Sequence, residues 1–251
     1  MIFIPFIFTA NYKSMRPLII LVLICICAAT GYSQLRTDMA LKYLVKEPAK
    51  RDSKTILIVL LHGYGSNEAD LFDLAPQFPS NAVVIAARAP IDVREGSFAW
   101  YNINRAGAAL ANPAEEEKAQ ALILQLLDQA GKKYNIHGNR TYLMGFSQGA
   151  IMSLCTALTH PEKINGIAVM SGRLLDEVKS KTVASEKINK VSIFIGHGTE
   201  DKVLPVQYGR DEKNYLESKK IKCEYHEYRM PHSISQDELK DIQQWLGKQL
   251  K

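Results

Sequence analysis

Long apolar runs are the feature of this chain that most restricts its fold. They lie within residues 56–61, 81–90, 140–147, 164–172 and 191–201. A strand that is apolar along its whole length is buried on both faces, as in a parallel sheet that has helices on either side. The runs therefore predict the interior strands of an α/β fold.

Helical patterns separate the apolar runs. Residues 112–134 begin with Asn112 as a cap and Pro113 at the first helical position, and acidic residues follow in the first turn. These are the signals of a helix start. Residues 206–220 and 235–250 also have a helical pattern, and we expect the second of these helices to close the fold.

Two further segments, residues 40–48 and 222–230, alternate apolar with polar side chains. A period of two predicts half-buried strands. The sequence contains no internal repeat, low-complexity tract or linker. We therefore expect one domain over residues 34–251, with a mostly parallel central sheet and helices on both faces.

Residues 1–33 have the layout of a secretion signal. A basic residue, Arg16, precedes an apolar run over residues 18–29, and small residues come next. This order indicates a signal with its true start at Met15 and cleavage before Gln34, and hence a periplasmic or extracellular protein without stable membrane insertion. An uncleaved membrane anchor is the alternative, although the apolar run is short for a membrane span.

Charge and cysteine content limit the classes of partner. The net charge of +5 becomes +3 when the signal is removed, because residues 1–33 contain Lys13 and Arg16 and no acidic residue. No block of basic residues points to a nucleic acid partner.

Two cysteines, Cys155 and Cys223, lie outside the predicted signal. Each lies in a predicted regular element, which favours buried free thiols over a disulfide. No grouped ligands have zinc or calcium spacing, so we expect neither a metal nor an organic cofactor.

The sequence "GFSQG" at residues 145–149 places a serine, Ser147, between a predicted strand and a predicted helix. In the G-x-S-x-G pattern the glycines leave room for a sharp turn that exposes the serine hydroxyl above the sheet. A small polar residue in an ordinary tight turn is the alternative. The position at a strand end favours a nucleophile, since sites in α/β sheets form beyond the carboxyl ends of the strands.

A serine nucleophile needs a base and an acid, which follow it in the chain in the order acid, then histidine. Glu200 and Asp201 both follow a buried strand, and we prefer Asp201 as the acid. His232 lies between the last strand and the last helix, where a general base can reach the serine. The remaining histidines downstream of Ser147 fit structural or surface positions better: His160, His197 and His226.

An oxyanion hole needs two hydrogen-bond donors. The backbone N–H of Gln148, directly after the serine, is one candidate. The loop "HGYG" at residues 62–65 follows the first apolar strand, and its Tyr64 N–H is the second candidate. We interpret His62 in the same loop as structural.

Together these motifs resemble the phospholipase/carboxylesterase group of α/β-hydrolases, which includes the acyl-protein thioesterases. The resemblance rests on motifs that run in family order: "LHGYG", "RAP", "AWY", "GFSQGA", "HGTEDKVLP" and "MPHSI". It implies an α/β-hydrolase fold without a large cap domain. It also implies that Ser147 is the nucleophile, Asp201 the acid and His232 the base. It also implies that Trp100 lies near the acyl or alcohol pocket, with a core aromatic as the alternative. Tyr64 stands where the family often has leucine, and Pro231 where it commonly has glycine.

The resemblance implies a cofactor-independent serine carboxylesterase that acts on small-molecule or lipid-like esters with short or medium acyl chains. The same triad would serve a lysophospholipase, an acyl-thioesterase or an esterase acting on plant polymers, and a peptidase is a further alternative. A non-catalytic binding protein on the same fold would usually lack a triad member. Residues 90–110 are long and irregular, and we expect them to shape a lid or a substrate rim.

Overall fold

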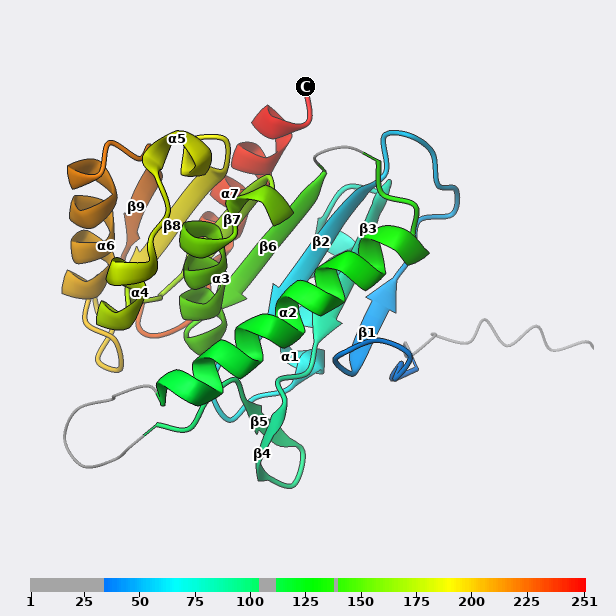
Figure 1. Cartoon of the computed structure of the whole chain (residues 1–251), viewed down its shortest axis with the longest axis horizontal. Coiled ribbons are helices and arrows are strands. Elements are labelled where there is room, and N and C mark those ends of the chain that lie inside the picture. The colour runs from blue at the N-terminus through cyan, green and yellow to red at the C-terminus, as the bar shows by residue number, and fades with distance from the viewer. Residues whose placement is uncertain (1–33, 104–111, 138–139) are drawn as a thin grey trace, which may run out of the picture. The chain divides into compact units, whose positions relative to one another are not determined.

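A seven-stranded sheet forms the centre of the protein in a computed structural model that describes residues 34–103, 112–137 and 140–251 (Figure 1). The strand order is β1-β3-β2-β6-β7-β8-β9, and every neighbouring pair is parallel except β1 with β3. These strands are β1 (Tyr43–Lys46), β2 (Ile56–Leu61), β3 (Ala82–Ala87), β6 (Thr141–Phe146), β7 (Gly166–Met170), β8 (Ser192–Gly198) and β9 (Glu224–Tyr228).

Helices cover both faces of the sheet (Figure 1). They are α1 (Glu68–Phe72), α2 (Pro113–Lys133), α3 (Gln148–Thr159), α4 (Asp176–Lys181), α5 (Ser185–Ile188), α6 (Gln207–Ser218) and α7 (Gln236–Gln249), with short 3₁₀ helices η1 (Ala75–Gln77) and η2 (Pro161–Lys163). Side chains of α2 and α3 pack on one face, and those of α1 and α7 pack on the other. The fold is the expected α/β-hydrolase arrangement.

Strand β2 shows why the apolar runs have no polar face. Ile56, Ile58 and Leu60 pack with the α1 and α7 side of the sheet, whereas Leu57 and its alternating neighbours pack with the α2 and α3 side. Every residue of β2 is buried. Burial of one such side chain contributes about 1.5–3 kcal/mol, so a polar residue at any of these positions would be costly.

The predicted helix starts are confirmed. The Asn112 side chain accepts a hydrogen bond from the Ala114 N–H at 3.2 Å, with Pro113 at the first position of α2. Ser235 caps α7 in the same way, accepting from the Glu238 N–H at 3.1 Å. Both caps satisfy N–H groups that have no partner inside the helix.

The segment expected to be irregular is in part a hairpin. Strands β4 (Ile91–Arg94) and β5 (Ser97–Ala99) pair antiparallel around Gly96, whose φ is +70°. The hydrophobic pattern did not predict this hairpin, because its strands are short and β4 is mostly exposed. The signal sequence expected over residues 1–33 lies outside the described residues. No helix within the described ranges is both long and apolar enough to span a bilayer.

Candidate active site

Ser147 occupies a strained turn between β6 and α3. Its φ of 54° and ψ of −117° are rare for a residue with a side chain and cost about 1–3 kcal/mol. Glycines on both sides make the turn possible. A Cβ on Gly145 would lie 2.1 Å from the Gly149 carbonyl oxygen, and a Cβ on Gly149 would lie 2.0 Å from the Leu61 carbonyl oxygen. The glycines of the motif are therefore steric requirements.

His232 and Asp201 complete a chain of hydrogen bonds that begins at Ser147. His232 Nε2 lies 2.9 Å from Ser147 Oγ, and His232 Nδ1 lies 2.6 Å from Asp201 Oδ2. A carboxylate only accepts hydrogen bonds, so we assign the proton to Nδ1, which leaves Nε2 to accept from the serine hydroxyl. The three residues come from the ends of β6, β8 and β9, which lie at one edge of the sheet.

Backbone groups fix the Asp201 side chain. Its second oxygen, Oδ1, accepts the N–H groups of Val203 and Leu204, each at 2.8 Å. The side chain is fully buried, and the loop after β8 encloses it. The carboxylate is thus held in one orientation toward His232.

The alternative acid, Glu200, and the alternative base, His197, have other partners and form no hydrogen bond with Ser147 in the described part of the chain. Glu200 is exposed and pairs with Arg229 at 3.0 Å. His197 is buried, and its Nε2–H donates to the Leu204 carbonyl at 2.7 Å. Burial lowers the pKa of His197, which favours the neutral ring.

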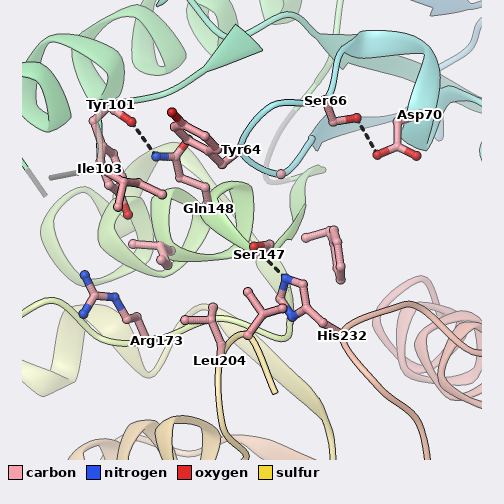
Figure 2. A pocket seen from close by; sticks show the side chains of 14 residues that line it. Tyr64, Ser66, Asp70, Tyr101, Ile103, Ser147, Gln148, Arg173, Leu204 and His232 are labelled. Atoms are coloured by element: carbon pink, nitrogen blue, oxygen red, sulfur yellow. Dashed lines mark hydrogen bonds between the residues drawn. The ribbon is translucent and has the colours of Figure 1, made fainter. Parts of the chain in front are cut away.

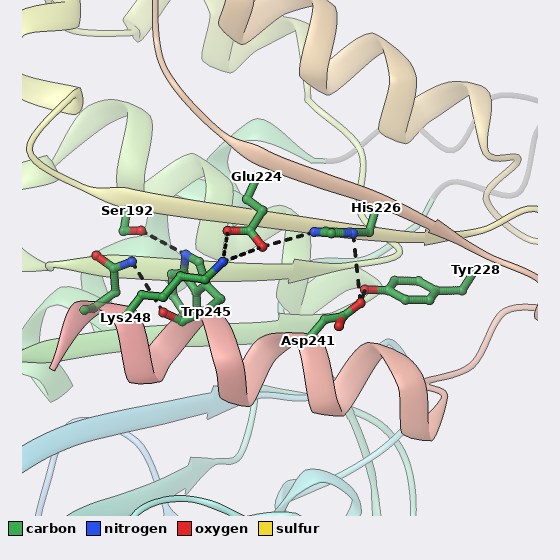
Figure 3. A network of polar contacts seen from close by, with 8 residues as sticks. Ser192, Glu224, His226, Tyr228, Asp241, Trp245 and Lys248 are labelled. Carbon is green, nitrogen blue, oxygen red and sulfur yellow. Dashed lines mark hydrogen bonds and ion pairs between the residues drawn. The ribbon is translucent and has the colours of Figure 1, made fainter. Parts of the chain in front are cut away.

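His226 is bound into a different network, between β9 and α7 (Figure 3). Its ring stacks on Phe194 with a centroid distance of 5.3 Å, and its Nε2 lies 3.2 Å from Glu224 Oε1. Asp241 on α7 lies 3.9 Å from its other nitrogen. The half-buried His226 thus packs the last strand against the last helix, and its ring does not simply face solvent.

The two expected oxyanion donors lie on the wall of the same pocket as Ser147. Gln148 is the first residue of α3, where backbone N–H groups have no partner within the helix. In the loop after β2, the Gly65 N–H donates to the Phe98 carbonyl and the Ser66 N–H to the Gly63 carbonyl. No backbone bond from the Tyr64 N–H is found among the described residues.

His62 supports this loop from beneath. Its Nδ1–H donates to the Gly63 carbonyl at 2.7 Å, and its Nε2 accepts the Ala89 N–H at 3.1 Å. The ring is buried, and this burial lowers its pKa, so the neutral form is favoured. The structural interpretation of His62 agrees with these contacts.

Trp100 is a core residue and not a pocket residue. It is fully buried, and its indole N–H donates to the His62 carbonyl at 2.9 Å. The described residues that line the pocket include Tyr101 and do not include Trp100. The alternative of a core aromatic therefore holds for Trp100, and the adjacent Tyr101 lines the pocket, because the chain after β5 turns Trp100 inward against His62.

The Gln148 side chain has a structural role that sequence reasoning missed. Its Oε1 accepts the Trp100 N–H at 2.8 Å, and its Nε2–H₂ donates to the Tyr101 carbonyl at 2.7 Å. It thereby joins the start of α3 to the chain that follows β5. No local sequence signal reveals this contact, since it spans 47 to 48 residues.

The pocket has a volume of about 430 Å³, and most of its wall is apolar (Figure 2). Its lining residues are Gly63, Tyr64, Ser66, Asp70, Tyr101, Ile103, Phe146, Ser147, Gln148, Ile151, Arg173, Val203, Leu204 and His232. In the part of the chain that the structure describes, no group of three or more His, Cys, Asp or Glu side chains is arranged to hold a metal ion.

The two described cysteines are free. Cys155 is buried in α3, and burial raises its pKa, so it carries little thiolate. Cys223 differs from the expectation, since it is only half-buried and precedes β9; burial still raises its pKa to about 11. Neither thiol is activated as a nucleophile.

The chain is similar to known esterases and thioesterases. Acyl-protein thioesterase 1 of Kluyveromyces lactis is 32% identical over 225 residues, which cover 82% of this chain and 94% of the relative. A probable inactive carboxylesterase of Oryza sativa subsp. japonica is 27% identical, over 80% of this chain and 88% of its own. The crystal structure of esterase PE8 superposes with a TM-score of 0.71 at 26% identity, over 81% of this chain and 96% of that one.

The family model for phospholipases and carboxylesterases matches residues 43–250, which is most of the chain and includes every residue of the candidate site. The chain therefore belongs to the phospholipase/carboxylesterase family of hydrolases.

Proposed function

We propose that this protein is an exported carboxylesterase that hydrolyses short or medium acyl esters through Ser147. His232 acts as the general base, and Asp201 orients it. One observation carries the proposal, namely the unbroken hydrogen bonds from Asp201 through His232 to Ser147 at the wall of an apolar pocket. Family membership supports esterase or thioesterase activity.

In the acylation step, the Ser147 oxygen attacks the ester carbonyl while His232 Nε2 takes the hydroxyl proton. The carbonyl oxygen becomes an oxyanion, which the N–H groups of Gln148 and Tyr64 stabilise. His232 then gives its proton to the leaving alcohol, and the C–O bond breaks. Asp201 stabilises the positively charged ring during this step.

In the deacylation step, water replaces the alcohol. His232 accepts a proton from the water as its oxygen attacks the acyl-enzyme carbonyl. The same two N–H groups stabilise the second oxyanion. The Ser147 oxygen then leaves and recovers its proton from His232, which releases the carboxylic acid.

Turnover of 4-nitrophenyl esters tests this assignment. His232→Ala should lower kcat by several orders of magnitude, because the serine loses its base. His226→Ala is the matched control, since it removes a histidine from the network between β9 and α7 and should keep kcat within about threefold. Near-normal turnover by the His232 variant would place the base elsewhere.

Thioester hydrolysis is the second candidate, because the relative from Kluyveromyces lactis is named as an acyl-protein thioesterase. Matched oxygen esters and thioesters of the same acyl group separate the two functions. A higher kcat/KM for the oxygen ester supports the carboxylesterase, and a higher kcat/KM for the thioester replaces it. The rice relative is named as a probable inactive carboxylesterase. An absence of turnover on both substrates would favour a non-catalytic binding protein on the same fold.

Export is part of the proposal and rests on the sequence of residues 1–33. The test is the intact mass of the chain after expression from Met15 in cells that have a secretion pathway. A mature chain that begins at Gln34 in the exported fraction supports export. An intracellular chain that keeps Arg16 would contradict it.

A further inference from the structure

Arg173 gives the pocket a charged end that hydrolysis itself does not use. Among the described lining residues it is the single lysine or arginine. It follows β7 by way of Ser171 and Gly172, at the same edge of the sheet as Ser147. A cation on the wall of a mostly apolar pocket can select an anionic group on the substrate.

The Arg173 guanidinium lies beside the Tyr208 ring. Its central carbon lies 6.0 Å from the centroid of the Tyr208 ring, within reach of a cation–π contact. Asp176 and Asp211 line an adjoining cavity that shares Arg173.

The pocket places Arg173 and His232 on opposite sides of Ser147 (Figure 2). Tyr101 and Ile103 lie on the Arg173 side. The leaving alcohol must receive its proton from His232, so it lies on the His232 side. The acyl chain then extends the other way, along apolar side chains and toward the guanidinium.

The opposite end of the pocket carries a negative charge. Asp70 lines it and accepts a hydrogen bond from the Ser66 hydroxyl at 2.7 Å (Figure 2). An anionic group on the alcohol would therefore meet a carboxylate, whereas an anionic group on the acyl chain would meet a guanidinium. The two charges favour one placement of a negatively charged substrate.

We propose that Arg173 binds a carboxylate at the far end of the acyl chain, so that the preferred substrates are half-esters of dicarboxylic acids. This inference rests on the proposed esterase function and narrows its substrate class. A guanidinium pairs with a carboxylate through two parallel hydrogen bonds, which an uncharged chain end cannot form. Such a contact typically changes affinity by about 10-fold to 100-fold.

Matched chromogenic esters test the inference. The 4-nitrophenyl half-ester of adipic acid and 4-nitrophenyl hexanoate have acyl chains of equal length and differ in the terminal carboxylate. Half-esters from succinate to suberate then vary the distance between the ester and the charge. A third substrate, the hexanoyl ester of 4-hydroxybenzoate, places the carboxylate on the alcohol.

The quantity to compare is the ratio of kcat/KM for the half-ester to kcat/KM for the neutral ester, because a general loss of activity cancels in it. We expect a ratio of at least about 10 for the best chain length, falling to about 1 in Arg173→Met and partly restored in Arg173→Lys. Arg229→Met is the control, since it removes an exposed arginine that pairs with Glu200 and should keep the wild-type ratio.

A ratio that Arg173→Met leaves unchanged would overturn the inference, and so would a preference for the carboxylate on the alcohol. If the wild-type protein hydrolyses none of these esters, the esterase function itself is wrong. If the protein hydrolyses 4-nitrophenyl hexanoate and prefers none of the half-esters, the proposed substrate class is wrong and the esterase function still stands.

Discussion

Gln148 Oε1 lies 2.8 Å from the backbone nitrogen of Trp100, and this bond links the residue after the serine to the chain that follows β5. The other end of the same amide donates to the Tyr101 carbonyl. Tyr101 lines the pocket, while Trp100 packs beneath it against His62. One side chain therefore sets the position of a pocket wall relative to the serine.

Gln148→Ala should lower kcat/KM on neutral esters by about 10-fold to 100-fold, because the wall that carries Tyr101 loses its attachment. It also leaves two buried backbone groups without partners, at a cost of about 1–3 kcal/mol in stability. Gln120→Ala is the control, since Gln120 is a buried glutamine that binds Cys155 and Thr159. Steady-state kinetics and thermal melts of both variants separate the two effects.

The control should lose stability and keep its kcat/KM within about threefold. If Gln148→Ala behaves like Gln120→Ala, with lower stability and normal kinetics, the positioning role of Gln148 is wrong.

Asp201→Asn should lower kcat by about three to four orders of magnitude, because an amide cannot hold His232 in the tautomer that accepts the serine proton. Glu200→Gln removes the neighbouring carboxylate, which is exposed and pairs with Arg229, and should stay near wild type. Burst and steady-state kinetics with 4-nitrophenyl acetate compare them. A larger loss in the Glu200 variant would reverse the assignment of the acid.

Gly149→Ala should destabilise the protein by about 3 kcal/mol or more, because its Cβ would lie 2.0 Å from the Leu61 carbonyl oxygen. Gly131→Ala in α2 is the matched change. Its Cβ would meet no atom within 4 Å, so alanine should stabilise the helix by about 0.5–1 kcal/mol. Denaturant unfolding of both variants measures the sign of each change in the free energy of unfolding. Equal effects of the two substitutions would show that the strained turn does not depend on Gly149.

Glu238 gives a pH dependence of stability. It is fully buried against β8, its carboxyl oxygens have no hydrogen-bond partner among the described residues, and burial raises its pKa from 4.5 to about 8. The unfolded chain releases this proton above pH 4.5, whereas the folded chain keeps it until about pH 8. The contribution of Glu238 to the free energy of unfolding therefore falls by about 1.4 kcal/mol per pH unit across this window, and no further above it.

Glu238→Gln should remove this contribution from the pH dependence and be more stable than wild type at pH 8, so the difference in free energy of unfolding between the two proteins should change by about 1.4 kcal/mol per pH unit. Glu217→Gln, which changes an exposed residue paired with Lys213, should keep the contribution. Urea unfolding at pH 5, 6, 7 and 8 measures it. Parallel curves for wild type and Glu238→Gln would mean that Glu238 is ionised in the folded protein.

Features that depend on local sequence were the ones that could be predicted. The buried strands followed from apolar runs such as residues 56–61, and the start of α2 from Asn112 and Pro113. Chain order and strand ends were enough to select His232 and Asp201, which the structure brings to Ser147. The reason is that parallel strands deliver their carboxyl ends to one edge of the sheet.

Features that depend on packing between distant segments could not be read from the sequence. Trp100 and Tyr101 are adjacent aromatic residues, and only the contact of Trp100 with the His62 carbonyl decides which of them faces the pocket. The same holds for the attachment of Gln148 across 48 residues and for the place of Arg173 on the pocket wall. Short helices such as α5 carry too few residues for a periodic pattern.

The most direct test of the central claim is covalent labelling of Ser147 by a fluorophosphonate, which reacts with serines activated by a neighbouring base. Intact mass followed by peptide mapping of the labelled protein should place one adduct on Ser147. Ser147→Ala should lose all labelling, while Ser153→Ala, which changes a buried serine of α3, should keep it. An adduct on another residue, or labelling that survives Ser147→Ala, would contradict the assignment of Ser147 as the nucleophile.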